Sequence, residues 1–466
     1  MKSHRLGLAA LVVLVAAACD FDVPNLNQPA IESLQKPTPS QVNALATGLL
    51  IGARKGATER VGFVTEWGVL GREAVVLTPS EPRFINALLG PSLSNGDANF
   101  GGNFWVIPYS NIRAANLLLH AVDSSALVGF TDAQKQAVRG FAKTIQALDY
   151  LQVVDAHDTN GVVLDVDHPL GDPPASIVTS LDTAYTFIEG LLDSAQGSLA
   201  AGGDSFPFKL GSGFAGLDTP ATFKKFNRAL RARVAVYHGK YPEALTALSA
   251  SFLDPDAPLS VGASHAFGAG SGDTPNDLND TSIFAHNSVV IDAEPLPGGG
   301  GGGGCAGAPP LPLQCLDRRV QAKVAPLASP FTLTNHSSAY ALTLYPSSVS
   351  PIPIIRNEEL ILLRAEANIG LGNLNSGGGP SALSDLNFIR TQSGGLRPRG
   401  PFASAAEAID ELLNQRRYSL LFEGGHRWID LRRYGKLDPA HVTVDPGDVI
   451  HPAFPIPLTE TQARGG

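Results

Sequence analysis

The sequence predicts a mainly α-helical protein of tetratricopeptide-like helical hairpins with long loop-rich insertions. Apolar residues recur at steps of three and four in several segments, and Val138, Phe141, Ile145 and Leu148 share one helical face in this way. Such segments follow one another as helix, turn, helix, although the period of about 34 residues that defines the tetratricopeptide repeat is not clean. We therefore expect stacked helical hairpins.

Turn and cap residues separate the predicted helices. Ser40 and Thr131 are suitable N-terminal caps, and Gly239 followed by Pro242 divides two neighbouring helices. The expected helices cover residues 40–55, 104–122, 131–155, 176–199, 219–238, 242–251, 357–370, 380–391, 404–422 and 427–434. The stretches 56–103 and 254–352 are rich in Gly, Pro and Asn, so they are predicted to be loop insertions in a single domain over 40–466.

Composition restricts the classes of function. Of 466 residues, 44% are hydrophobic, which is enough for a large core, and only 17% are charged. The formal net charge of −9 argues against a nucleic-acid binder, because such a protein carries a basic surface. A neutral sugar or a peptide remains compatible with this charge.

The N-terminal residues predict export and lipid attachment. Lys2 and Arg5 precede an unbroken small or apolar run over 6–18, followed directly by Cys19. As a helix this run measures about 20 Å, against a hydrocarbon core of roughly 30 Å, so it fits a signal peptide rather than a membrane span. Residues 16–19, Ala-Ala-Ala-Cys, resemble the bacterial lipobox. We expect a signal peptide over 1–18, lipid on Cys19 and an extended tether over 19–39.

The sequence leaves open which membrane carries this lipid. Asp20 after Cys19 favours inner-membrane retention under one sorting rule, whereas the acidic start over 19–22 is similar to surface-export signals of other lineages.

The remaining cysteines, Cys305 and Cys315, flank a short Pro-rich loop. Outside the cytoplasm this spacing favours a disulfide over a metal pair, with free thiols as the alternative.

The C-terminal third carries a series of motifs. They are Pro-Ile-Ile-Arg-Asn-Glu-Glu-Leu over 353–360, Leu-Arg-Ala-Glu-Ala over 363–367, Leu-Asn-Phe-Ile-Arg over 386–390, Asn-Gln-Arg-Arg over 414–417, Phe-Glu-Gly-Gly-His-Arg-Trp-Ile-Asp-Leu-Arg-Arg over 422–433 and Pro-Ile-Pro over 455–457. Trp105, Tyr109, Ile112 and Asn116 form a further helical motif, and 231–244 forms a hairpin motif. In this order and spacing the set resembles the SusD/RagB family of nutrient-binding outer-membrane lipoproteins.

This resemblance implies a non-catalytic lipoprotein on the outer membrane, exposed at the cell surface. It implies a TonB-dependent outer-membrane receptor as partner and an oligosaccharide or a peptide as ligand, with no cofactor and no metal. The chain departs from the family pattern at Gln415 and at Ser419, where acidic residues are usual. The local salt bridges of nearby arginines are therefore in doubt, but the fold is not.

Most motif residues have a structural interpretation. Glu423, Arg427, Asp430 and Arg432 lie at helical spacings that let them pair across a turn. Trp105 and Trp428 lie among apolar neighbours, so both are expected in the core. Trp67 differs, because it lies in an irregular segment where an aromatic side chain is less expected to be buried in the core.

The insertions are the expected ligand surface. Sugars bind to aromatic faces together with a few amides and guanidiniums that fix their orientation. The candidate ligand residues are Trp67, Arg72, Arg83, Phe84, Asn86, Asn99, Phe100 and Asn103 in the first insertion and Asn335, Tyr340 and Tyr345 in the second. The structural alternative for each of them is ordinary loop packing.

Two other functions have partial support in the sequence. Gly-Asp-Ser at 203–205 resembles the start of SGNH-type esterases, and Asp438 and His441 complete a possible triad with Ser205. Ser205 follows a helical run, however, and no strand–helix alternation surrounds it to present the hydroxyl. A periplasmic tetratricopeptide-like interaction scaffold is the other alternative. Metal-binding motifs of the His-Glu-x-x-His and Cys-x-x-Cys type do not occur in the sequence.

We predict that Cys19 becomes the first residue of the mature protein and carries the lipid. The intact mass of protein isolated from membranes should then lack residues 1–18 and include added acyl groups. Acyl chains contribute about 0.8 kcal/mol per buried CH₂, so two of them anchor a protein stably. A soluble mature form without acyl mass would contradict this prediction.

Overall fold

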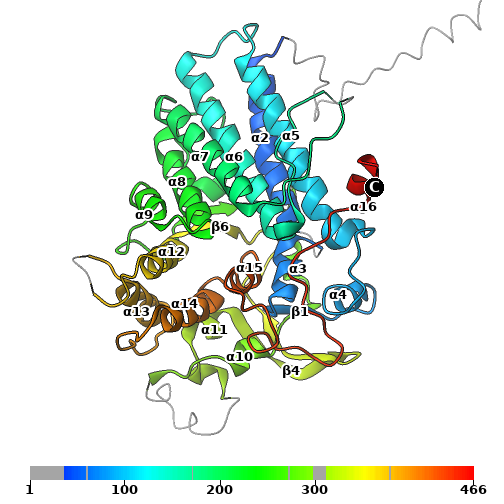
Figure 1. Ribbon diagram of the computed structural model, residues 1–466, viewed down its shortest axis with the longest axis vertical. Coiled ribbons are helices and arrows are strands. Elements are labelled where there is room, and N and C mark those ends of the chain that lie inside the picture. The colour runs from blue at the N-terminus through cyan, green and yellow to red at the C-terminus, as the bar shows by residue number, and fades with distance from the viewer. Residues whose placement is uncertain are drawn as a thin grey trace, which may run out of the picture.

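The computed structural model describes residues 36–58, 61–169, 172–270, 273–297, 311–376 and 379–465. The predicted signal peptide, Cys19, most of the tether and Cys305 lie outside these residues. Figure 1 shows long helices side by side in one half of the molecule, with shorter helices and a sheet in the other. The protein is mainly α-helical with tetratricopeptide-like hairpins, as the sequence predicts.

The first half consists of helices that pack in chain order. These helices are α2 (Pro39–Thr58), α5 (Asn103–Asp123), α6 (Asp132–His157), α7 (Leu181–Ala200), α8 (Pro220–Tyr237) and α9 (Tyr241–Ser249). After α2 contacts α5, each helix contacts the next. The predicted helices are confirmed here, with small shifts at their starts: Thr38 rather than Ser40 caps α2, accepting a hydrogen bond from the backbone N–H of Gln41.

Helix α6 shows why these segments fold as predicted. Thr131 caps it in a capping box with Gln134. Its predicted apolar face is buried at Val138, Phe141 and Ile145, whereas Leu148 is only half-buried. The last residue of this face therefore stays accessible.

The second half gathers the C-terminal motifs around one central helix. The helices are α12 (Asn357–Gly370), α13 (Ala382–Gln392), α14 (Ala405–Ser419), α15 (His426–Arg433) and α16 (Leu458–Ala463). Helix α12 packs against α13 and α14 on one side and against α8 and α9 on the other. It thereby joins the two halves into one body (Figure 1).

Both predicted insertions contain regular structure that the sequence did not indicate. The first includes α3 (Phe63–Leu70), β1 (Ala74–Val76), α4 (Arg83–Asn86) and the π-helical turn η2 (Ala98–Gly102). The second includes β2 (Gly262–His265), β3 (Ile283–Ala285), α10 (Ser288–Ile291), α11 (Arg318–Lys323), β4 (Val324–Leu333) and β5 (His336–Leu342). An antiparallel sheet in the order β1-β3-β5-β4 joins the two insertions, and β2 pairs with β6 (Ile352–Arg356). The insertions are therefore loop-rich but also contain short strands. Apart from the β4–β5 hairpin, these strands find their partners far along the chain.

The charged motif residues are structural. Asp430 pairs across its own turn with Arg433 at 3.0 Å, but the other contacts differ from the expected ones. Glu423 contacts Lys323 (3.0 Å) and Arg356 (2.8 Å) instead. Asp430 binds Arg416 at 2.5 Å, so this arginine has an acidic partner despite the departure at Gln415. Apart from Arg433, these partners come from other elements of the fold. A buried charge is costly unless an opposite charge lies beside it, and the fold places one there from a separate segment.

Other expectations about single residues are confirmed in part. Trp428 is fully buried and Trp105 is 6% exposed, so both belong to the core. Cys315 is buried and disulfide-bonded. Its pairing with Cys305 stays a prediction. Within the described part of the chain, every helix is too short or too polar to cross a membrane.

The close contact of α6 and α7 generates a stability prediction. A Cβ added at Gly140 would lie 2.5 Å from Leu199 Cγ and 3.0 Å from the backbone oxygen of Ala195. We expect Gly140→Ala to lower the free energy of unfolding by about 1–3 kcal/mol through overpacking. Gly190→Ala on α7 is the matched control, because a Cβ there meets open space. Gly190→Ala should raise the free energy of unfolding by up to about 1 kcal/mol, because alanine favours the helix more than glycine does. Thermal unfolding followed by circular dichroism measures both, and equal stabilisation would show that the helices are not in close contact.

Candidate functional site

The first predicted ligand residue, Trp67, lies in the core rather than in an irregular segment. It is 3% exposed, and its ring lies 5.1 Å from Phe63, 5.6 Å from Phe104 and 6.0 Å from Trp428 between centroids. Gly425 makes this packing possible, because a Cβ at its left-handed φ of 71° would lie 2.2 Å from Trp67 Cβ. The expectation of an exposed aromatic is therefore wrong.

Phe84 and Phe100 are core residues as well. They are 1% and 0% exposed, and their rings pack edge-to-face at 5.0 Å. The Arg83 guanidinium covers Phe100 at 4.8 Å from the centroid and is held by Glu81 (2.6 Å) and Asp97 (2.9 Å). These three candidates thus stabilise the first insertion, and only Arg83 keeps part of its side chain in solvent.

Arg72 has a structural role too. Its side chain is 1% exposed and pairs with Asp448 at 3.1 Å, while Nη1 donates to the backbone oxygens of Val69 (3.2 Å) and Leu70 (3.3 Å). Burial lowers the pKa of the guanidinium, and the Asp448 carboxylate opposes this shift. Arg72 therefore fixes the C-terminal loop to the end of α3.

The remaining candidates, from both insertions, divide between core and surface. Tyr345 is buried, and its hydroxyl donates to the backbone oxygen of Phe422 at 2.9 Å. Burial raises the pKa of this phenol well above its usual value. Tyr340 is half-buried in β5, and Asn103 is half-buried at the start of α5. Asn86 at the end of α4 is exposed.

The structure brings the two predicted segments together at one pocket of about 180 Å³. Asn86 and Ser92 come from the first insertion, Asn335 and His336 from the β4–β5 turn, and Asp448 from the C-terminal loop. Ile85 and Pro91 supply apolar wall. This combination of amide, hydroxyl, imidazole and carboxylate groups suits the hydroxyls of a neutral ligand.

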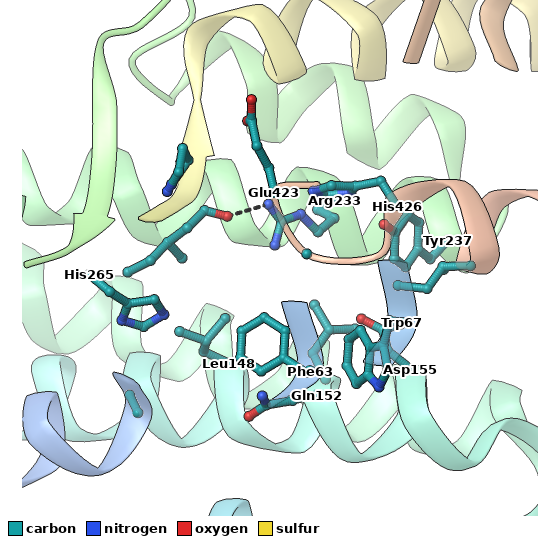
Figure 2. A pocket seen from close by; sticks show the side chains of 16 residues that line it. Phe63, Trp67, Leu148, Gln152, Asp155, Arg233, Tyr237, His265, Glu423 and His426 are labelled. Atoms are coloured by element: carbon teal, nitrogen blue, oxygen red, sulfur yellow. Dashed lines mark hydrogen bonds between the residues drawn. The ribbon is translucent and has the colours of Figure 1, made fainter. Parts of the chain in front are cut away.

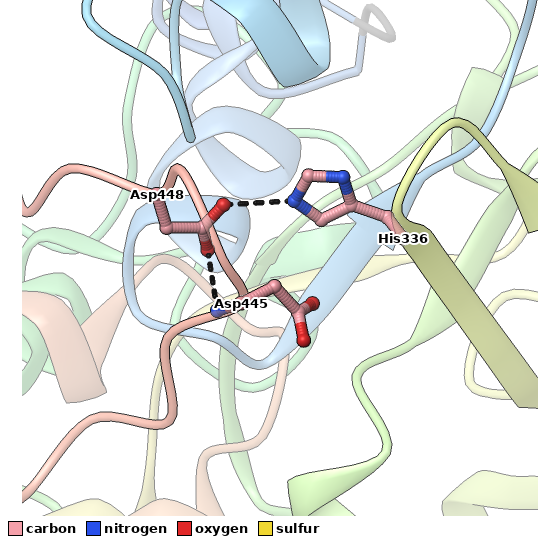
Figure 3. Close-up of side chains that lie close together, drawn as sticks. All are labelled: His336, Asp445 and Asp448. Carbon is pink, nitrogen blue, oxygen red and sulfur yellow. Dashed lines mark hydrogen bonds and ion pairs between the residues drawn. The ribbon is translucent and has the colours of Figure 1, made fainter.

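A cluster of polar contacts fixes this pocket (Figure 3). His336 Nε2 lies 2.8 Å from Asp448 Oδ1, and the Asp445 backbone N–H donates to Asp448 Oδ2 at 3.3 Å. Burial alone would raise the pKa of Asp448, but the hydrogen bond from His336 and the charge of Arg72 outweigh it and hold the pKa below its usual value. Asn335 donates to the Pro446 oxygen. The turn of the hairpin is thereby attached to the C-terminal loop.

His336, Asp445 and Asp448 also offer the ligand types of a metal site, with ligand atoms within 4.8 Å of one another. Arg72 already neutralises one of the two carboxylates, Asp448, at 3.1 Å. We therefore interpret the trio as a clamp between the hairpin and the C-terminal loop.

The sequence offered little to single out His336 and Asp448 as site residues. They are 112 positions apart, and only the tertiary structure pairs them. The one available signal is the turn-type sequence Asp-Pro-Gly-Asp over 445–448, which predicts an exposed loop carrying carboxylates.

The esterase residues are only partly assembled. His441 Nδ1 lies 2.8 Å from Asp438 Oδ1, whereas His441 Nε2 faces Lys436 Nζ at 3.4 Å. Ser205 has no hydrogen bond to His441 among the residues that the structure describes. It lies in the loop after α7, beside Phe206, which packs into an aromatic cluster with Phe141 of α6 and Phe223 of α8.

Comparison with known proteins agrees with this architecture. Residues 346–460 match the model of the SusD family. A SusD superfamily protein from Bacteroides vulgatus is similar in structure with a TM-score of 0.64 at 14% identity, over 92% of this chain and 98% of that one. The C-terminal part of the chain therefore matches the SusD family, and the chain as a whole shares the fold of solved SusD-like structures.

Other solved SusD-like structures share the fold. A SusD-like carbohydrate-binding protein from Bacteroides fragilis gives a TM-score of 0.66 at 14% identity, over 92% of this chain and 99% of that one. A laminarin-binding SusD-like protein gives 0.59 at 17% identity, over 91% and 97%. No curated protein matches the sequence at a significant level. The match to the SusD family model runs from before β6 to the first residues of α16, whereas the structural likeness extends over the helical hairpins as well.

The position of Trp67 generates the second stability prediction. We expect Trp67→Ala to lower the free energy of unfolding by about 3–5 kcal/mol, as removal of a core aromatic does. Val128→Ala is the control, because Val128 is 78% exposed and should change stability by less than about 0.5 kcal/mol. Chemical denaturation measures both. An unchanged midpoint for Trp67→Ala would mean that the ring lies outside the core.

Proposed function

We propose that this SusD-like protein binds an oligosaccharide and delivers it to a TonB-dependent outer-membrane transporter without catalysing a reaction. The proposal places it on the cell surface, anchored by lipid on Cys19, with residues 40–466 as one ligand-binding domain. Its support is the SusD fold together with the descriptions of two neighbours as laminarin-binding and carbohydrate-binding. A peptide ligand and a periplasmic scaffold remain the alternatives.

The observation that carries the proposal is the pocket between α4 and the β4–β5 turn. Three segments far apart in the chain each supply polar side chains to it, among them Asn86, Asn335 and Asp448. Oligosaccharides expose many hydroxyls that donate and accept, so their recognition needs such groups held at fixed positions. The clamp of His336 and Arg72 on Asp448 provides that rigidity.

An aromatic surface is available on the same hairpin. Phe331 lies in β4, two residues before its end at Leu333, and is 41% exposed. Its ring stacks on Phe284 with centroids 5.3 Å apart and planes 16° apart. A flat apolar ring of this kind can contact the C–H face of a sugar. The polar pocket itself does not offer such an aromatic surface.

We predict that Asn86→Ala weakens oligosaccharide binding about 5- to 10-fold, as loss of one or two hydrogen bonds does. The thermal midpoint should stay the same, because Asn86 is exposed. Isothermal titration calorimetry with laminarin oligosaccharides, followed by a wider glycan panel, measures the affinity.

Asn95→Ala is the matched control, since Asn95 is an exposed asparagine of the same insertion and does not line the pocket. Equal effects of the two variants would move the site elsewhere. Binding of peptides but of no glycan would replace the proposed ligand class.

A further inference from the structure

A second hollow lies between the helical hairpins and the second half of the protein. It consists of an outer cleft of about 500 Å³ and an inner chamber of about 60 Å³. Both are lined by Ala53, Leu148, His265 and Ile354, so the chamber continues the cleft inward. Neither contains a residue of the pocket at Asn86.

The outer cleft is mainly apolar. Its walls include Ile51 of α2, Ile145 of α6 and Phe214, and Ile51 is 47% exposed. At its rim Arg54 is held by Asp273 at 2.5 Å and by a backbone oxygen. An apolar body can therefore lie in the cleft without displacing an ion pair.

The inner chamber also has mainly apolar walls, but several polar groups among its lining residues lack partners; Figure 2 shows these residues. Trp67 Nε1, Asp155 Oδ1 and His426 Nδ1 are buried and form no hydrogen bond within the described ranges. All three residues line the chamber. A buried polar atom without a partner costs about 1–3 kcal/mol, so such atoms are normally satisfied by water or by a ligand.

The formal charges around the chamber are already balanced. Arg233 pairs with Glu359 at 2.7 Å, and Glu423 is held by Lys323 and Arg356. These charged groups line or adjoin the chamber without needing a further counter-charge.

The remaining groups favour a neutral ligand. Burial lowers the pKa of His265 to about 3 and that of His426 to about 4, so both imidazoles are uncharged at neutral pH. Burial raises the pKa of Asp155 to about 7, although nearby arginines oppose the shift. The chamber thus offers donors and acceptors in a low-dielectric space where an isolated ion would be poorly solvated.

We propose that the cleft and the chamber form a second ligand site for a neutral amphipathic molecule. Its uncharged head, a primary amide or a hydroxyl, enters the chamber, and its apolar body lies in the outer cleft. A carbonyl or hydroxyl oxygen accepts the hydrogen bond of Trp67 Nε1, while an amide or hydroxyl hydrogen is donated to Asp155 Oδ1 or His426 Nδ1. This site is independent of the proposed oligosaccharide pocket.

The three indole N–H groups provide a direct test. Trp105 Nε1 donates to Glu460 (3.3 Å) and Trp428 Nε1 donates to the His451 oxygen (2.8 Å), whereas Trp67 Nε1 has no partner in the described part of the chain. In protein labelled with ¹⁵N-tryptophan, 4-phenylbutanamide should shift the Trp67 indole resonance saturably and leave the other two in place. Trp67→Phe identifies that resonance by removing it.

A charged isostere tests the neutrality of the head. 4-Phenylbutanoate has the same apolar body and a carboxylate in place of the amide. We expect it to bind at least about ten-fold more weakly, because its charge must be desolvated beside balanced groups. Equal affinity for the two compounds would overturn the assigned head chemistry.

Ile51→Asp tests the outer wall. Ile51 is exposed enough for the substitution to leave folding intact, and the added carboxylate should weaken binding of the amide about five-fold or more. Ile291→Asp is the matched control, because Ile291 is 54% exposed and lines neither the cleft nor the chamber. Equal effects of the two variants, or no saturable Trp67 shift up to about 10 mM amide, would mean that the chamber holds water only.

Discussion

Helix α12 buries three glutamates, and the arrangement of the protein depends on the arginines that neutralise them. Glu359 pairs with Arg233 of α8, Glu366 with Arg433 of α15, and Glu358 with Arg356 at the end of β6. Burial alone would raise the pKa of Glu358 and of Glu359, but the adjacent arginines hold both at about 2. Removing one partner of such a buried pair costs about 3–5 kcal/mol, because the other charge is left without compensation. Each pair therefore fixes a different element against α12.

This ionic framework also determines where the candidate sites lie. Arg356 binds Glu423 as well as Glu358, and the turn after Glu423 carries the glycine that accommodates Trp67. Arg233 also donates to the Ile354 oxygen, which positions β6 over the inner chamber (Figure 2). On the other side of α3, Arg72 attaches the C-terminal loop to the β4–β5 turn through Asp448 and His336. The pocket at Asn86 and the two-part cleft thus rest on a single rigid core.

The helices were predictable where one face is polar. From Ala137 onward, helix α6 leaves only a narrow half-buried stripe at Arg139, Lys143, Leu148 and Gln152. This stripe marks the helical period, and the cap at Thr131 marks the start of the helix. Helix α3 has eight residues, nearly all of them buried, so it has no polar face to mark a helical period. Strands β1 and β3 have three residues each and are wholly buried, which is too short for an alternating pattern. Their existence depends on partners supplied by the other insertion.

By itself, the sequence determined the helical class, the order of the hairpins and the resemblance of the motifs around α12 and α15 to the SusD/RagB family. It also identified the two insertions that meet at the pocket, and Asn86 within it. Only the tertiary structure decided that Trp67, Phe84, Phe100 and Tyr345 lie in the core while Asn335, His336 and Asp448 join Asn86. The physical reason is that burial and charge pairing are properties of contacts between distant segments. A local sequence reports the faces of a helix, but not which remote side chain will cover them.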